Sequence, residues 1–213
     1  MTIIAKNEGT KRELIPAGSH VARCYSMVHL GTAEEELGGQ KKIRNVVRIT
    51  WELPEELREF KEGEPMLPMV ISKEYTLSMF SKASLRIDLE GWRGKGFSED
   101  EAKAFEITKL LGKTCLISVI HKTSAGGNEY ATINSISTLP KSMKCPDQIN
   151  DTFEWNFDDN FDTTAYENFP DFIKDRITIS SEWIAKVQDE VQEVLEETPS
   201  TDKYPASDDD LPF

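Results

Sequence analysis

The chain has 213 residues and a net charge of −13 at pH 7, with 25 lysines and arginines against 38 aspartates and glutamates. Its length suits one domain of ordinary size together with a polar segment. No apolar run approaches the roughly 20 residues of a membrane helix, and the first residues lack the apolar stretch of a signal peptide. These features predict a cytoplasmic protein without a membrane segment. Three distant cysteines with no CxxC pair argue against a disulfide framework or a zinc ribbon and predict reduced thiols.

The charge is distributed unevenly along the chain. Residues 1–145 hold 21 basic and 19 acidic side chains, whereas residues 146–213 hold 4 basic and 19 acidic ones. The first part is therefore close to neutral, and a local basic face on it could still bind a polyanion. We predict three parts: a folded body (1–145), an acidic aromatic extension with a C-terminal helix (146–197), and a flexible linker with an acidic tip (198–213).

Within the body, hydrophobic periodicity predicts three strands, a helix and two more strands. In the second strand Val47, Ile49 and Trp51 alternate with basic and polar residues, as in a strand with one buried face. In the helix Leu85, Leu89 and Trp92 recur at helical spacing. A capping-box pattern at Ser98 opens a short second helix. The strands are predicted at 18–30, 42–53, 69–77, 114–122 and 129–138, and the helices at 81–92 and 98–106, with Glu34, Glu35 and Glu36 in a loop after the first strand.

This order of elements, β-β-β-α-β-β, is that of the OB-fold, a small barrel that binds single-stranded nucleic acids and oligosaccharides. We therefore predict a mainly β protein with a five-stranded OB-fold barrel, additional helices and a disordered acidic C-terminal tail. Because a fold does not fix a function, a plain β-barrel with no ligand stays as the alternative.

The extension combines seven aromatic residues between 153 and 172 with many acids. One interpretation is a segment that packs over the barrel surface; the other is an acidic mimic of a nucleic-acid strand lying in the groove. A helix follows at roughly 181–197, with an apolar stripe that would pack on the barrel or form a homodimer. The stripe consists of Ile184, Val187, Val191, Val194 and Leu195.

The last residues place three acids before an apolar group, a proline and a phenylalanine: Asp208, Asp209, Asp210, Leu211, Pro212 and Phe213. This end is similar to the acidic tip of bacterial single-stranded DNA-binding proteins and several phage counterparts. In the body, the stretches 75–78, 85–94 and 111–116 resemble phage-encoded single-stranded DNA-binding proteins.

The resemblance implies an OB-fold that binds single-stranded DNA without sequence preference during phage DNA replication, recombination and repair in a bacterial host. It also implies that the six tip residues recruit partner enzymes such as a polymerase, helicase, exonuclease or recombinase. In that family the terminal phenylalanine enters an apolar pocket of the partner.

Binding of this kind needs cations along the phosphate backbone and flat side chains on which bases stack. Candidates occur on the predicted outer faces and in a glycine-flanked loop: Arg23, Tyr25, Arg44, Arg48, Lys73, Tyr75, Arg86, Trp92, Arg93 and Lys95. Each has an alternative interpretation, since the aromatic residues could belong to the core and the cations to ordinary solvated surface.

The sequence favours a protein that is not an enzyme and uses no cofactor or metal. It has no HxH, HExxH, GxSxG or phosphate-loop motif, and its three histidines are far apart. A metal-dependent nuclease, an acidic DNA mimic that blocks host enzymes, and a strand-annealing recombination mediator are the alternatives.

Overall fold

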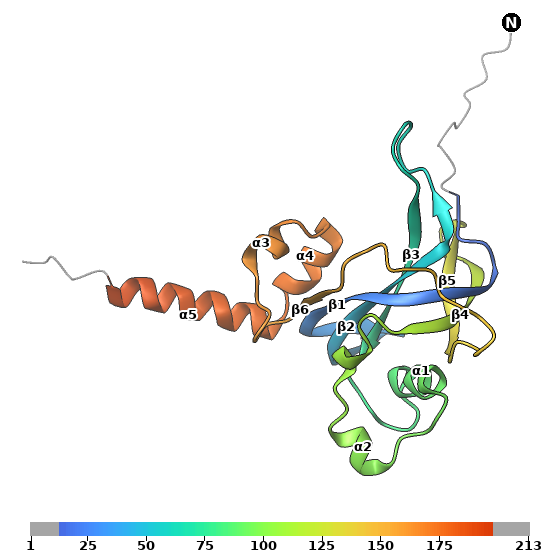
Figure 1. The fold of residues 1–213 in the computed structure, drawn as a ribbon. Coiled ribbons are helices and arrows are strands. Elements are labelled where there is room, and N and C mark those ends of the chain that lie inside the picture. The colour runs from blue at the N-terminus through green and yellow to red at the C-terminus, as the bar shows by residue number, and fades with distance from the viewer. Residues whose placement is uncertain (1–12, 198–213) are drawn as a thin grey trace, which may run out of the picture.

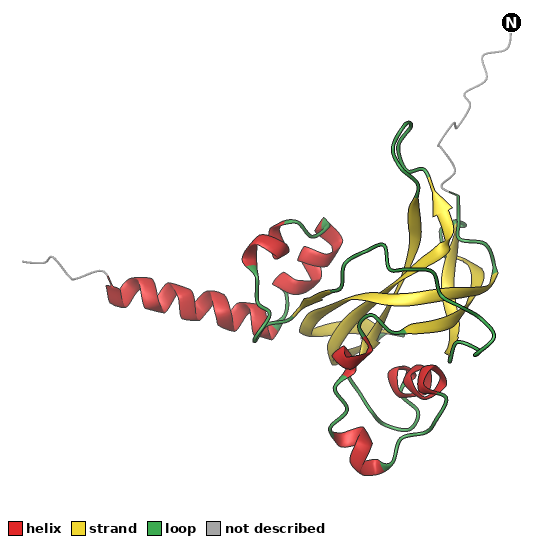
Figure 2. Cartoon of the chain, viewed as in Figure 1, coloured by secondary structure: helices red, strands yellow, loops and turns green. Residues whose placement is uncertain are grey.

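The computed structural model describes residues 13–197. Its strands are β1 (Gly18–Leu37), β2 (Gln40–Arg58), β3 (Leu67–Thr76), β4 (Thr114–Thr123), β5 (Glu129–Ser137) and β6 (Phe153–Trp155) (Figure 1). The α-helices are α1 (Ser84–Arg93), α2 (Glu99–Lys103), α3 (Thr163–Glu167), α4 (Asp171–Thr178) and α5 (Ser181–Glu197), and a 3-10 helix, η1, covers Ile107–Leu110 (Figure 2). The protein is therefore mainly β with a few helices.

The strands form one sheet in the order β3-β2-β1-β4-β5, with antiparallel neighbours throughout. The short β6 adds a parallel ladder to β1 at Ser26 to Val28. Up to β5, the predicted order of three strands, a helix and two strands is confirmed. The capping box is confirmed as well, because Ser98 accepts a hydrogen bond from the Glu101 backbone N–H while the Glu101 side chain accepts one from Ser98.

The first two strands are longer than predicted. The segment from Gly31 to Leu37, expected as a loop, continues β1 and pairs with the start of β2 across a turn at Gly38 and Gly39. Its acids lie opposite the bases of β2, and Lys41 donates to Glu34 over 2.7 Å. Favourable cross-strand charge pairs of this kind stabilise a hairpin, which explains why a glutamate-rich segment forms a strand.

One core lies on the inner face of the sheet, where α1 packs. Trp51 of β2 is fully buried there, 5.8 Å from Trp92 of α1 between ring centroids. Cys24 and Cys115 are buried in the same core, and burial raises the pKa of both thiols. They are free cysteines, as predicted, and stay protonated at neutral pH.

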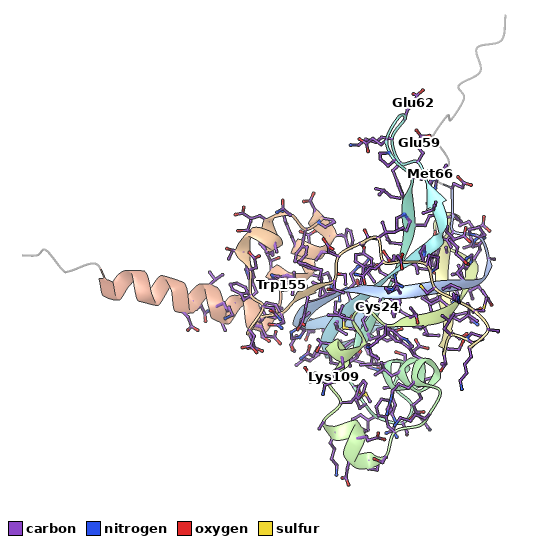
Figure 3. All side chains as sticks on the ribbon, viewed as in Figure 1. Cys24, Glu59, Glu62, Met66, Lys109 and Trp155 are labelled. Carbon is purple, nitrogen blue, oxygen red and sulfur yellow. The ribbon has the colours of Figure 1, made fainter. Side chains whose placement is uncertain are left out.

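A second core lies on the other side of β1 and β2. Trp155 and Phe157 of the extension are 1% and 3% exposed and pack against Val28, Leu30 and Val46. Figure 3 shows Trp155 where the extension meets the sheet. The first interpretation of the extension, a segment that packs over the sheet, is therefore confirmed.

The last described element, α5, points away from the sheet (Figure 1). At its start Ile184 and Val187 are 46% and 42% exposed. The side chains of the other stripe positions, Val191, Val194 and Leu195, and the whole predicted tail, 198–213, lie outside the described residues. In the part of the chain that is described, no helix is long and apolar enough to cross a membrane.

Candidate nucleic-acid interface

Two of the predicted stacking residues, Tyr75 and Trp92, belong to the core, which was the alternative interpretation of both. Tyr75 is 1% exposed and its hydroxyl donates to Asp88 Oδ2 over 2.8 Å. Burial and the Asp88 carboxylate raise the pKa of Tyr75. Trp92 is 5% exposed and its indole N–H donates to the Thr114 carbonyl. A base could reach neither ring without opening the core.

Two predicted cations are also used inside the fold. Lys73 lies on the same face of β3 as Tyr75, and its ammonium donates to Asp88 Oδ2 over 2.6 Å. The Arg86 guanidinium is buried and donates to Glu90 and to the carbonyls of Met79 and Phe97. Arg86 therefore ties the loop after β3 to the loop before α2, and a phosphate would have to compete with these partners for its guanidinium.

The extension covers the predicted site on β1. Arg23 donates to Glu52 over 3.4 Å and to the Pro146 carbonyl over 2.6 Å. The fully buried Glu52 carboxylate also accepts hydrogen bonds from the backbone N–H groups of Ile149 and Asn150, at 3.3 and 2.8 Å. We call residues 146–150 the strap.

Tyr25 lies beside this arrangement and is only partly exposed. Burial raises its pKa, and the nearby Glu52 raises it further. The strap and Glu52 therefore hold the guanidinium of Arg23, which was predicted to contact phosphate. The ring of Tyr25 beside it is half-buried.

Arg44 and Arg48 belong to a network of ion pairs on the outer face of β2. Arg44 pairs with Glu35, and Arg48 pairs with Glu74 over 3.1 Å while lying 5.1 Å from the ring centroid of Phe172. Arg176 of α4 contacts both Glu35 and Glu74. Because acids from β1 and β3 already neutralise these cations, phosphate binding here would require exchange of partners.

Arg93 and Lys95 share the Glu101 carboxylate, with nitrogen–oxygen distances of 3.1 and 3.3 Å. The backbone N–H of Ser98 and both cations hold the pKa of Glu101 down at about 2. The Arg93 guanidinium lies 3.8 Å from the ring centroid of Phe97, whereas the Lys95 side chain is 64% exposed. Of this pair, Lys95 is the one that solvent reaches freely.

Phe80, in the loop between β3 and α1, is not among the residues predicted from the sequence. Its side chain is 84% exposed, and it lines a groove of about 430 Å³. The groove is formed by Leu77, Ser78, Met79, Phe80, Ser81, Arg86, Glu99, Ala102 and Lys103. The sequence itself could have indicated an exposed ring, because Phe80 falls in a serine-rich turn outside both the strand pattern and the helix pattern.

The described part also carries lysines that are exposed and form no ion pair with another described residue: Lys42, Lys82, Lys113, Lys122, Lys141 and Lys144. In the same part of the chain, no group of three or more histidine, cysteine, aspartate or glutamate residues is arranged to hold a metal ion. The ten predicted residues do not form one continuous open face, and the accessible candidates are Lys95, these lysines and Phe80.

Compared with known proteins, the chain matches no protein-family model and no curated protein sequence.

Proposed function

We propose that this chain is a non-catalytic, sequence-nonspecific single-stranded DNA-binding protein of the phage type, with an OB-fold body. It would protect single strands in the cytoplasm of a bacterial host during replication, recombination and repair. Residues 208–213 would recruit enzymes of those processes.

The observation that carries the proposal is the connectivity of the sheet. β1 is hydrogen-bonded to both β2 and β4, so β3 and β5 end the sheet, and these two strands approach each other. The chain passes from β3 to β4 through α1, which packs under the inner face and contacts both β3 and β5. An OB-fold has this arrangement, with the sheet bent into a partly open barrel, and its members commonly bind single strands.

The covered surfaces narrow down where DNA would bind. Burial of Trp155 and Phe157 contributes on the order of 1.5–3 kcal/mol for each side chain, so a DNA strand would not readily displace the extension. This leaves the loop between β3 and α1, the neighbourhood of α2 and the exposed lysines. An exposed aromatic ring and mobile cations are the components that sequence-tolerant binding requires.

The proposal is tested by fluorescence anisotropy of a labelled oligo-dT strand titrated with the full chain at two salt concentrations, with a duplex of equal length in parallel. We expect binding to the single strand only, weakening with salt at a log–log slope of about −0.7 per neutralised phosphate. Absence of binding to either DNA, both with the full chain and after removal of residues 205–213, would overturn the proposal and favour an acidic DNA mimic. Loss of the labelled strand on addition of magnesium would instead indicate a nuclease.

A further inference from the structure

We infer that Phe80 and the groove beside it form a subsite that stacks one nucleobase of a bound single strand, with Lys82 and Lys103 beside the neighbouring phosphates. The inference rests on the proposed function and goes further by locating a base-binding position that lies outside the predicted set of residues.

The loop between β3 and α1 exposes an aromatic ring to solvent. Phe80 is 84% exposed, whereas Phe97 and Phe157 are 8% and 3% exposed. Folding gains little from a ring left in water, so the faces of this ring are available to a ligand.

Hydrogen bonds hold the loop on both sides of this ring. The Ala83 N–H donates to the Phe80 carbonyl over 2.8 Å, and Arg86 donates to the Met79 carbonyl over 3.1 Å. The Leu77 N–H donates to the Asn45 carbonyl of β2 over 2.8 Å. The ring is thus presented on a fixed backbone, which reduces the entropy that binding would cost.

The shape and lining of the groove suit a flat heterocycle. Its volume of about 430 Å³ lies within the range of small-ligand sites, and it combines apolar side chains with the hydroxyl groups of Ser78 and Ser81. A base has two apolar faces and a polar edge, so stacking on Phe80 would leave its edge free to hydrogen-bond with these hydroxyls.

Charge at the groove favours a polyanion as the occupant. Lys82 is exposed and makes no ion pair with another residue of the described chain. Lys103 pairs with Asp100 at 3.3 Å, but the two side chains are 74% and 97% exposed, so water screens the pair and a phosphate could compete for the lysine. Glu99, the acid in the groove lining, lies 3.5 Å from the Arg86 guanidinium.

Phe60 provides the contrast within the same chain. It is 52% exposed in the loop between β2 and β3, where Glu59, Glu62 and Glu64 surround it in sequence. Glu59 and Glu62 lie at the tip of this hairpin in Figure 3. These carboxylates outnumber the neighbouring Lys61, which pairs with Glu64, and would repel a phosphate backbone. A third exposed phenylalanine, Phe172, already lies 5.1 Å from the Arg48 guanidinium. Of the three, Phe80 with the exposed Lys82 beside it has the surroundings that suit DNA best.

The test uses the full chain and labelled oligo-dT. We expect Phe80→Ala to weaken binding about 5- to 150-fold, the range for loss of one stacked base. Phe80→Trp should bind at least as tightly as the wild type, and Phe80→Leu should lie between wild type and Phe80→Ala because it keeps apolar bulk without a flat ring. The matched control, Phe60→Ala, should leave the affinity unchanged.

A second readout separates stacking from charge. Lys82→Ala should reduce the steepness of the salt dependence by about 0.7, whereas Phe80→Ala should leave the slope unaltered. If the wild type binds and Phe80→Ala binds equally well, the inference is wrong while the proposed function stands. Equal losses of DNA affinity in Phe80→Ala and Phe60→Ala would also overturn the inference about Phe80. Failure of the wild type to bind any single strand would remove the proposed function itself. Unchanged thermal unfolding of each variant would confirm that the comparison concerns folded protein.

Discussion

The buried carboxylate of Glu52 links the sheet to the extension. It is fully buried, yet it accepts hydrogen bonds from the Ile149 N–H, the Asn150 N–H and the Asn150 side-chain amide, and it faces Arg23. A buried charge is tolerated only when such partners replace water. Glu52 therefore selects one path for the strap across β1 and β2.

Replacing this carboxylate tests that role. Glu52→Gln keeps the shape of the side chain but removes the negative charge that faces Arg23. It also replaces one acceptor oxygen by an NH₂ group, which would point at hydrogen-bond donors. We expect the free energy of unfolding to fall by roughly 1–3 kcal/mol, measured by urea denaturation. Glu62→Gln, at the exposed hairpin tip, serves as the control and should change stability by less than about 0.5 kcal/mol. Equal effects of the two substitutions would contradict the assignment of Glu52.

At the scale of elements, the outer face of β1 is shaped by a bulge at Gly31. The ladder to β2 shifts register between His29 and Gly31, and Gly31 has a φ of +84°. A Cβ atom there would lie 2.5 Å from Cβ of Ser180, a fully buried residue between α4 and α5. The close approach of the Ser180 side chain to the Gly31 backbone brings the end of the extension onto β1.

This contact predicts a difference between two glycine substitutions. Gly38→Ala places a side chain at a φ of +59° with no atom within 4 Å, so it adds backbone strain alone. Gly31→Ala adds similar strain and also a clash with Ser180. We expect Gly31→Ala to lower the thermal midpoint by several degrees more than Gly38→Ala, consistent with an extra cost of about 1–3 kcal/mol. Equal shifts would show that Ser180 can move away at no cost.

The elements with a clear period could be predicted from the sequence, because period depends on neighbours in the chain. The spacing of Leu85, Leu89 and Trp92 predicted α1, and the bounds of α5 agree with its apolar stripe. Periodicity does not say which surfaces meet. Tyr75 of β3 was predicted on an outer face of the sheet, but α1 covers it.

The outer face of β2 also makes contacts that periodicity does not predict, here with residues far away in the sequence. Thr50 and Glu52 alternate with the inner residues as predicted, but both are buried rather than open to solvent. Glu52 meets its partners about a hundred residues further along the chain. No local sequence pattern predicts such contacts, so some of the candidate site residues were predicted on a surface that the extension covers.

At the scale of the whole molecule, the acidic extension attaches to the near-neutral body mainly through aromatic rings, together with the Glu182 carboxylate, which accepts hydrogen bonds from the backbone N–H and the hydroxyl of Thr32. Trp155 packs against Phe157, Phe161 and Phe169, whereas Asp158 and Asp159 are exposed. The extension thus binds the sheet while carboxylates such as Asp158 and Asp159 stay exposed to solvent. Any polyanion that approaches the body meets this acidic surface, and binding should depend strongly on salt.

Removal of residues 205–213 tests whether the tip adds to that competition. The segment carries three aspartates, and a tethered anionic segment competes with DNA for exposed lysines at a high effective concentration. We expect the truncated chain to bind oligo-dT more tightly at low salt, on the order of fivefold or about 1 kcal/mol, with the difference shrinking as salt screens the charges. Phe213→Ala keeps all three aspartates and should leave DNA affinity unchanged, which separates the charge of the tip from its apolar end. Unchanged or weaker binding after truncation would reject competition by the tip and would leave partner recruitment as its proposed role.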